Sequence, residues 1–231
     1  MARSLPGIRM RELRAGYGDR QVLGPLNLTL RGGEAATFIG PGGAGKSTLL
    51  SILHRIPVPA LWIEGRLQLP PGASRLLAQK PPAPPGTLRE RLREAAPGSD
   101  PTVALAEVWA SLPEAGAEVS ALLDEPLAAL DPGRRRIALL TLTLAGDPPL
   151  VFLDEPEADL DEPWFSWVCD AVAARRRPTR ILATHHLELA RRSSDQLILL
   201  IGGQVIEAAP TRVMFESPVH PRTRDFLRMG S

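Results

Sequence analysis

The sequence contains a single cysteine and carries a formal net charge of only +1, and each scarcity excludes a class of protein. One cysteine, Cys169, excludes an intramolecular disulfide and a metal cluster built from cysteines. It lies in an apolar helical pattern with Trp164, Val168 and Val172, which predicts a core or half-buried thiol rather than a reactive one. The small net charge argues against a general nucleic-acid binder, so no nucleic-acid partner is expected.

Long hydrophobic runs are also missing. The longest apolar runs, residues 137–145 and 197–201, are too short to span a bilayer, and the N-terminus has no signal-peptide core. We therefore expect a cytoplasmic protein that lies at the inner face of the membrane only through partner subunits. A hydrophobic content of 44% over 231 residues suits one large domain, or a core with a small subdomain.

A glycine-rich stretch at residues 40–48 carries the strongest motif. It fits G-x-x-x-x-G-K-[ST] at every fixed position, between a predicted strand at 35–39 and a helix from Ser47, which disfavours a mere glycine-rich turn. Glycines let backbone N–H groups turn towards a polyphosphate, and the helix N-terminus adds positive charge. Lys46 can reach the β- and γ-phosphates, and the Ser47 hydroxyl can ligate Mg²⁺. The predicted nucleotide-binding residues are Gly40, Pro41, Gly42, Gly43, Ala44, Gly45, Lys46, Ser47 and Thr48.

Short apolar segments alternate with helical patterns in the rest of the chain. The proline-rich residues 80–86 predict an extended linker, and residues 88–144 are helical with interruptions at 97–98 and 113. This alternation, split by a helical insert, predicts an α/β core that carries an α-helical subdomain. The predicted strands are 8–13, 22–30, 35–39, 62–69, 76–77, 150–153, 180–184, 196–201 and 204–207. Further helices are predicted at 164–175 and 187–192, with two short pieces in the tail.

Two carboxylates follow the apolar strand 150–153. Functional groups gather at the carboxyl ends of parallel strands, so Asp154 can hold Mg²⁺ together with Ser47 and phosphate oxygens. Glu155 is then placed to polarise a water in line with the γ-phosphate. A solvated acidic turn is the alternative, and the apolar strand and the phosphate loop disfavour it.

These residues make the chain resemble the ATP-binding subunits of ABC transporters over nearly its whole length. Residues 40–48 resemble the Walker A motif and residues 150–155 the Walker B motif. Gln79 resembles the Q-loop glutamine, His185 the switch histidine and Tyr17 the aromatic residue that stacks on adenine. The segment that resembles the D-loop, with alanine in place of the usual serine, is Ala158, Asp159, Leu160 and Asp161.

The resemblance implies a P-loop NTPase fold of the ABC type, with a RecA-like core, N-terminal antiparallel strands and an inserted α-helical subdomain. It implies one ABC ATPase domain over residues 1–231, with the core at 1–79 and 146–231 and the helical subdomain at about 80–145. It further implies hydrolysis of MgATP in a head-to-tail dimer bound to transmembrane permease subunits. The implied roles are phosphate binding for Lys46, Mg²⁺ binding for Ser47 and Asp154, metal or water sensing for Gln79, the base for Glu155 and γ-phosphate positioning for His185.

The family's signature, Leu-Ser-Gly-Gly-Gln, is degraded in this chain. Asp131 replaces a hydroxyl donor with a charge like that of phosphate, Pro132 removes a backbone N–H, and Arg134 restores charge without the same geometry. A charge-assisted hydrogen bond is worth roughly 1.5–3 kcal/mol, so we expect a weak site here. Intact Walker residues beside it predict a heterodimer with a second ATP-binding subunit, with a homodimer as the alternative. The segment consists of Leu130, Asp131, Pro132, Gly133 and Arg134.

Shorter stretches favour phosphate import, because residues 53–65, 79–84 and 215–223 resemble phosphate-import ATP-binding proteins. Two other functions compete with transport: a non-transport ABC ATPase acting on DNA or ribosomes, and a regulatory module with weak hydrolysis. The first usually has coiled coils, zinc modules or tandem cassettes, none of which this sequence shows. The degraded signature keeps the second open.

Three local patterns receive structural interpretations. Residues 124–131 imitate a second Walker B and D-loop pair, but no apolar core strand precedes them, so we reject a second centre. The arginines at 134–136 are predicted to form a solvated helix face near the nucleotide, and those at 175–177 to lie near a helix C-terminus. His186 is predicted to be a surface residue at a helix start.

Overall fold

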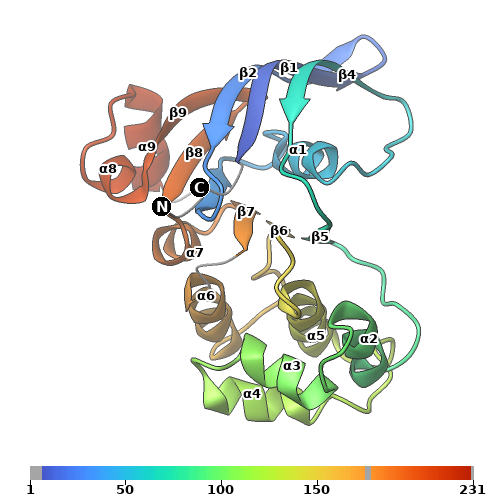
Figure 1. The fold of residues 1–231 in the computed structure, drawn as a ribbon. Helices are drawn as coiled ribbons and strands as arrows, with labels where there is room; N and C mark the ends of the chain where they lie inside the picture. Colours follow the sequence, from blue (N-terminus) through green and yellow to red (C-terminus); the bar gives the residue numbers. More distant parts are fainter. Residues whose placement is uncertain (1–6, 175–177, 230–231) are drawn as a thin grey trace, which may run out of the picture.

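The computed structural model describes residues 7–174 and 178–229, whose strands form two sheets (Figure 1). The strands are β1 Ile8–Tyr17, β2 Arg20–Leu30, β3 Ala35–Ile39, β4 Leu61–Gln68, β5 Ser74–Leu77, β6 Leu150–Asp154, β7 Thr179–Thr184, β8 Gln196–Ile201 and β9 Gln204–Pro210. One sheet is antiparallel with the order β2-β1-β4, and the other has the order β5-β6-β7-β3-β8-β9. In the second sheet β5 to β8 run parallel and only β9 is antiparallel, so the predicted α/β core with N-terminal antiparallel strands is present.

The helices divide between the core and the insert. They are α1 Lys46–Leu53, α2 Leu88–Ala95, α3 Pro101–Val108, α4 Pro113–Ser120, α5 Pro132–Leu144, α6 Trp164–Ala174, α7 Leu187–Ser193, α8 Thr211–Glu216 and α9 Pro221–Met229. Helices α2 to α5 lie together at one end of the molecule, far from the antiparallel sheet (Figure 1). Pro113, predicted as an interruption, is the first residue of α4, because proline at this position loses no helical hydrogen bond.

The apolar side chains form separate clusters on the two faces of the central sheet. Strands β3, β6 and β7 are buried along their whole length, as their apolar runs predicted. One cluster joins β6 to the helical insert and includes Trp109, whose Nε1–H donates to the Thr141 hydroxyl at 3.0 Å. A second joins the sheets to α1 and includes Phe38 and Phe152. Apolar side chains therefore pack against both faces of the central sheet, and this packing holds the ends of its strands in position.

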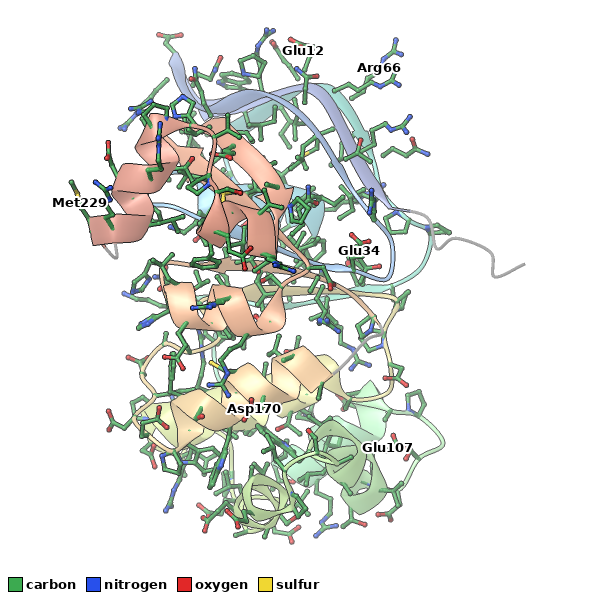
Figure 2. The ribbon with its side chains drawn as sticks, turned by 90° about the vertical axis from the view of Figure 1, so that its left-hand side faces the viewer. Glu12, Glu34, Arg66, Glu107, Asp170 and Met229 are labelled. Atoms are coloured by element: carbon green, nitrogen blue, oxygen red, sulfur yellow. The ribbon has the colours of Figure 1, made fainter. Side chains whose placement is uncertain are left out.

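Strand β1 is longer than predicted. The sequence pattern ends it at residue 13, whereas the structure continues it to Tyr17. The reason is an irregularity at Glu12, where φ is +50° and the pairing registers shift, so the alternation of apolar residues breaks and restarts. Glu12 lies at the end of the molecule opposite to Glu107 of the helical insert (Figure 2).

The arginines at 134–136 do not share one solvated face. Arg134 is exposed, but Arg135 donates to the carbonyl oxygens of Leu127, Ala128 and Leu130. Arg136 is only 4% exposed, so the prediction of a solvated side chain is wrong for it. Its guanidinium donates to backbone carbonyls of other segments. The periodicity of a helix sequence carries no information about such distant partners. The predicted arginine cluster at 175–177 lies outside the described residues.

The sequence that imitates a second catalytic pair lies outside any strand. Asp124 sits in a turn, where its carboxylate pairs with the Arg89 guanidinium at 2.6 Å on the surface. Neither carboxylate of the Asp124–Glu125 pair follows a buried strand. The ground for rejecting a second centre, that no buried strand precedes this segment, is therefore seen in the structure.

Cys169 offers a first testable prediction. Its side chain is buried in α6, and burial raises the pKa of the thiol to about 12, as expected for a core cysteine. Since the thiolate is the nucleophile, we expect iodoacetamide at pH 8 to label the folded protein roughly a thousandfold more slowly than the denatured chain. Mass spectrometry of a labelling time course measures this ratio. Equal rates in the two states would contradict the buried position.

Candidate functional site

The predicted site residues come from the same edge of the parallel sheet. The loop after β3 leads to Lys46, the first residue of α1; the segment after β5 contains Gln79, and β6 ends at Asp154. Strand β7 ends at Thr184, directly before His185. Since these strands are parallel neighbours, their carboxyl ends lie at the same edge of the sheet.

The loop between β3 and α1 is closely packed against the core. Gly40 has φ +151°, and a side chain there would collide with the Leu200 carbonyl oxygen, 2.0 Å from the position of a Cβ. Gly45 precedes α1 with φ +98°, a left-handed conformation that favours glycine. The Lys46 ammonium lies inside the loop and donates to the carbonyl oxygens of Gly40 at 2.6 Å and Pro41 at 3.1 Å.

The electrostatic environment of Lys46 is mixed. Its side chain is buried, and burial lowers the pKa of the ammonium, while the nearby carboxylates of Glu155, Asp154 and Glu157 oppose this shift. A buried cation with only carbonyl partners is incompletely compensated. The loop is therefore suited to an anionic ligand that brings its own negative charge.

Asp154 has an oxygen atom without a hydrogen-bond partner among the described residues. Its side chain is 5% exposed, and Oδ1 is the buried, unpaired atom. Burial raises the pKa of the carboxyl group, and a hydrogen bond with the Ser47 hydroxyl acts in the opposite direction. One carboxylate and one hydroxyl are the oxygen donors that Mg²⁺ uses when phosphates supply further ligands. These two residues therefore fit Mg²⁺.

Glu155 is the centre of a side-chain triad. Gln79 Nε2 donates to Glu155 Oε2 at 2.8 Å, and His185 Nδ1 lies 3.2 Å from Glu155 Oε1. The backbone of Glu155 has φ +46°, which is uncommon for a residue with a side chain, and its N–H donates to the Ala183 carbonyl at 2.8 Å. The carboxylate is thus directed along the strand ends by contacts on both of its oxygens.

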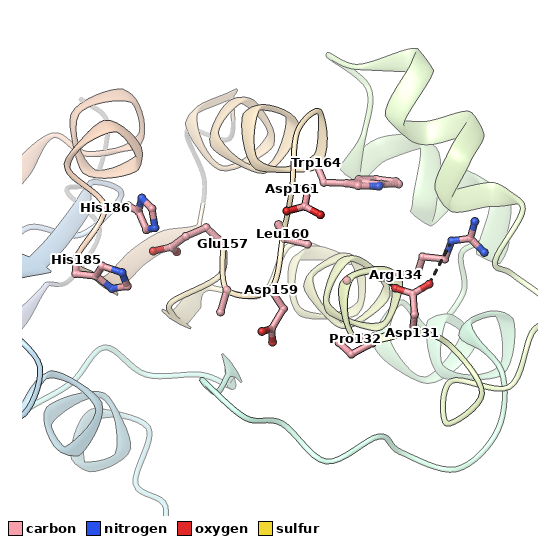
Figure 3. Close-up of a pocket in the computed structure, with 12 residues that line it drawn as sticks. Asp131, Pro132, Arg134, Glu157, Asp159, Leu160, Asp161, Trp164, His185 and His186 are labelled. Atoms are coloured by element: carbon pink, nitrogen blue, oxygen red, sulfur yellow. Dashed lines mark hydrogen bonds and ion pairs between the residues drawn. The ribbon is translucent and has the colours of Figure 1, made fainter.

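A cavity of about 810 Å³ is lined by both the degraded signature and the predicted D-loop (Figure 3). Asp131 is the N-cap of α5: its Oδ1 accepts the Arg134 N–H at 3.0 Å, and Pro132 is the first helical residue. The Arg134 Nε lies 3.5 Å from Asp131 Oδ2. The arginine that departs from the family's signature therefore pairs with the aspartate that also departs from it. The lining residues are Asp131, Pro132, Gly133, Arg134, Glu157, Ala158, Asp159, Leu160, Asp161, Trp164, His185 and His186.

Glu157 has a position that the sequence did not predict, whereas the position of His186 was predicted. Glu157 is buried, accepts the hydroxyl of Thr184, and has a pKa that burial raises. It stands in an acidic run that is typical of a solvated turn, so no sequence signal marked its burial. His186 is the N-cap residue of α7, as predicted.

Tyr17 belongs to the antiparallel sheet, whereas the other predicted site residues follow strands of the parallel sheet. It is the last residue of β1 and is 37% exposed. Its role against adenine stays a prediction.

Comparison with known proteins gives the family. Residues 23–158 match the family described as ABC transporter. The aliphatic sulfonates import ATP-binding protein SsuB 1 of Nocardia farcinica is 32% identical, over 94% of this chain and 86% of its own length. The phosphate import ATP-binding protein PstB 2 of Natronomonas pharaonis is 29% identical, over 96% of this chain and 86% of its own length.

Longer proteins also match. The mycobactin import ATP-binding/permease protein IrtB of Mycolicibacterium thermoresistibile is 31% identical over 87% of this chain, which spans only 37% of that protein. Among solved structures, a bacterial Atm1-family ABC exporter with ATP bound matches with a TM-score of 0.78 at 19% sequence identity. The match covers all of this chain and 44% of the exporter chain, and it shows the fold alone. Within residues 7–174 and 178–229, no helix has the length and apolar character needed to cross a membrane. The family match and the SsuB relative together show that this chain belongs to the ABC transporter family, as an ATP-binding subunit and an ATPase that uses ATP with Mg²⁺.

Proposed function

We propose that the edge of the parallel sheet is the site of MgATP hydrolysis, and that this hydrolysis drives a membrane permease. The observation that carries the proposal is the Glu155 carboxylate held between Gln79 and His185. It lies at the same strand ends as the buried Lys46 and the unpaired oxygen of Asp154. A carboxylate oriented from two sides, near groups that fit phosphate and metal, suits the activation of a water molecule.

Each side chain has a separate task in this mechanism. Lys46 and the loop amides bind the phosphates, and Tyr17 stacks on the adenine. Ser47 and Asp154 hold Mg²⁺, which neutralises phosphate charge when bound. Glu155 accepts the proton of the attacking water, Gln79 orients the Glu155 carboxylate and senses the metal or the water, and His185 positions the γ-phosphate.

The domain boundaries suggest how the site communicates with a permease. The core spans residues 1–79 and 146–231, and the helical subdomain about 80–145. The proline-rich segment after Gln79 connects the two and lines a cavity of about 570 Å³ with α2 and α5. A permease subunit bound there, at the inner face of the membrane, would be directly linked to a site residue.

The degraded signature supports a heterodimer. In a head-to-tail homodimer both nucleotides would meet Asp131, whose carboxylate already caps α5 and would repel phosphate. A different subunit with an intact signature would complete the site of Lys46 and Glu155. The partner's own nucleotide would then lie against the weaker surface of this chain.

Repair of the signature tests the arrangement. We expect the isolated chain to hydrolyse ATP slowly, and the variant Asp131→Ser, Pro132→Gly, Arg134→Gln to turn over about 10- to 100-fold faster. The estimate assumes that one charge-assisted hydrogen bond of roughly 1.5–3 kcal/mol is restored in the transition state. The three changes leave the net charge unaltered, and Glu155→Gln in the repaired background must remove the gain. A fast wild-type homodimer that is indifferent to the repair would contradict the heterodimer.

For the transported substrate we propose inorganic phosphate, as the resemblance of residues 53–65, 79–84 and 215–223 suggests. Relatives named for phosphate, aliphatic sulfonates and anions support an oxyanion. The test is co-purification of the chain from membranes, identification of the permease, and uptake of labelled phosphate by cells that lack this chain. If phosphate uptake is unchanged and uptake of a sulfonate is reduced, phosphate is not the substrate and a sulfonate takes its place in the proposal.

A regulatory ABC ATPase with weak hydrolysis is the second candidate, and the Asp131 cap is the observation that favours it. This function predicts that no permease co-purifies with the chain.

A further inference from the structure

A buried arginine connects helix α5 to the catalytic edge of the sheet. Arg136 Nη1 donates to the carbonyl oxygens of Ala78 at 2.8 Å and Gln79 at 3.0 Å. Its Nη2 donates to the carbonyl oxygen of Asp154 at 3.0 Å and to that of Glu155. One guanidinium therefore joins the segments that follow β5 and β6 to a helix that is distant in sequence.

Burying the charge of Arg136 costs free energy, so the contacts that compensate this charge are important for the structure. Burial lowers the pKa of Arg136, and the carboxylates of Glu157, Asp159, Asp154 and Glu155 oppose the shift. A buried cation is tolerated only when hydrogen bonds and opposite charges compensate it. The planar guanidinium of arginine holds two amino groups in a fixed geometry that reaches two chain segments, whereas the lysine ammonium is a single compact donor centre on a flexible stem, so lysine is not an equivalent.

The carbonyl of Glu155 belongs to a residue with an uncommon backbone conformation. With φ at +46°, Glu155 has a backbone conformation that side chains disfavour and that surrounding contacts must maintain. Its N–H donates to Ala183, and its carbonyl oxygen accepts from Arg136 and from the Ala158 N–H at 3.0 Å. The direction of the Glu155 side chain depends on this backbone conformation, because the Cα–Cβ bond follows φ.

We propose that Arg136 is a positioning residue for ATP hydrolysis. It holds the backbones of Gln79 and Glu155 in one arrangement, so that the carboxylate stays directed at the attacking water. Because Arg136 lies in the second turn of α5, it also links the signature segment to both residues. The inference rests on the proposed role of Glu155.

Arg75 provides a matched control. This arginine of β5 also donates to backbone carbonyls: to Leu142 at 2.9 Å, and to Ala145 and Ala95. Leu142 and Ala145 lie at the opposite end of α5 and Ala95 ends α2, so Arg75 joins β5 to the helical insert without contacting the site. Loss of either arginine therefore removes hydrogen bonds between α5 and the chain around β5.

The experiment compares Arg136→Met, Arg136→Lys and Arg75→Met in the full chain. ATP affinity, single-turnover hydrolysis with protein in excess, the midpoint of thermal unfolding and amide hydrogen exchange are measured for each. A displacement of about 1 Å at a reacting group costs roughly a hundredfold in rate, so we expect this loss for Arg136→Met at unchanged ATP affinity. Arg136→Lys should fall between wild type and Arg136→Met. Exchange at residues 154–158 should accelerate in both Arg136 variants and not in Arg75→Met.

The outcomes separate positioning from general stabilisation. An equal loss of turnover in Arg75→Met would show that Arg136 only stabilises the fold. Wild-type turnover in Arg136→Met would overturn the proposal directly, and if that variant does not fold, Arg136→Lys decides in the same way. If neither the wild-type chain nor the variant with the repaired signature turns over ATP, the proposed function fails. The exchange data then decide the inference separately, because unchanged exchange at residues 154–158 contradicts it.

Discussion

Glu155→Gln should leave ATP bound and slow its hydrolysis by roughly 10²- to 10⁴-fold, the range that general-base catalysis contributes. Glutamine keeps the shape of the side chain but cannot accept the proton of the attacking water. The carboxylate now receives contacts from Gln79 and His185, and glutamine can retain one such contact. The measurement is single-turnover conversion of ATP to ADP, with ATP binding recorded in parallel.

The chain contains its own control for this substitution. Glu125 stands in the tripeptide Asp-Glu-Pro, which Asp154, Glu155 and Pro156 repeat at the site. Because Glu125 lies on the surface in a turn, Glu125→Gln should leave hydrolysis unchanged. Wild-type hydrolysis in Glu155→Gln, or an equal loss in both variants, would mean that the water is activated elsewhere.

Lys46→Ala should weaken ATP binding by roughly 10²- to 10³-fold. Two charge-assisted hydrogen bonds to phosphates, at roughly 1.5–3 kcal/mol each, would account for this range after partial compensation by water. The ammonium already lies in the loop, on the carbonyl oxygens of Gly40 and Pro41, so little rearrangement is needed to meet a ligand. Titration calorimetry with ATP and Mg²⁺ measures the effect.

The fold of the Lys46→Ala variant should be preserved. Burial lowers the pKa of Lys46, so the charged form is less stable in the folded protein than in the unfolded chain, and its removal takes away an electrostatic cost. Lys80→Ala, which removes an exposed lysine, is the control for a lost cation. Unchanged ATP affinity in a folded Lys46→Ala protein would contradict the assignment of the phosphate loop.

Patterns that depend on local sequence predicted the structure well. Strands β3 and β8 have the predicted bounds, because uniform apolar runs between turn residues leave little freedom. The loop 40–48 follows from its glycines and its flanking elements. The convergence of Gln79, Glu155 and His185 follows from parallel topology, which places the ends of the strands at one edge.

Features that depend on distant partners were not predictable. Arg136 stands in a basic run that suggests solvent exposure, and only carbonyls more than fifteen residues away explain its burial. The continuation of β1 to Tyr17 depends on an irregularity at Glu12 that breaks the apolar alternation. Glu157 resembles its acidic neighbours in sequence, and tertiary packing alone distinguishes it.

The aspartate cap of α5 has a thermodynamic consequence. A ligand raises the melting temperature of a protein only through binding free energy that the folded state gains. At α5 the Arg134 N–H is already bonded to Asp131 and Pro132 has no N–H, so a phosphate from a partner's nucleotide finds fewer donors there. In a dimer, thermal stabilisation of this chain by ATP should therefore saturate with occupancy of the Lys46 loop and be insensitive to the second nucleotide.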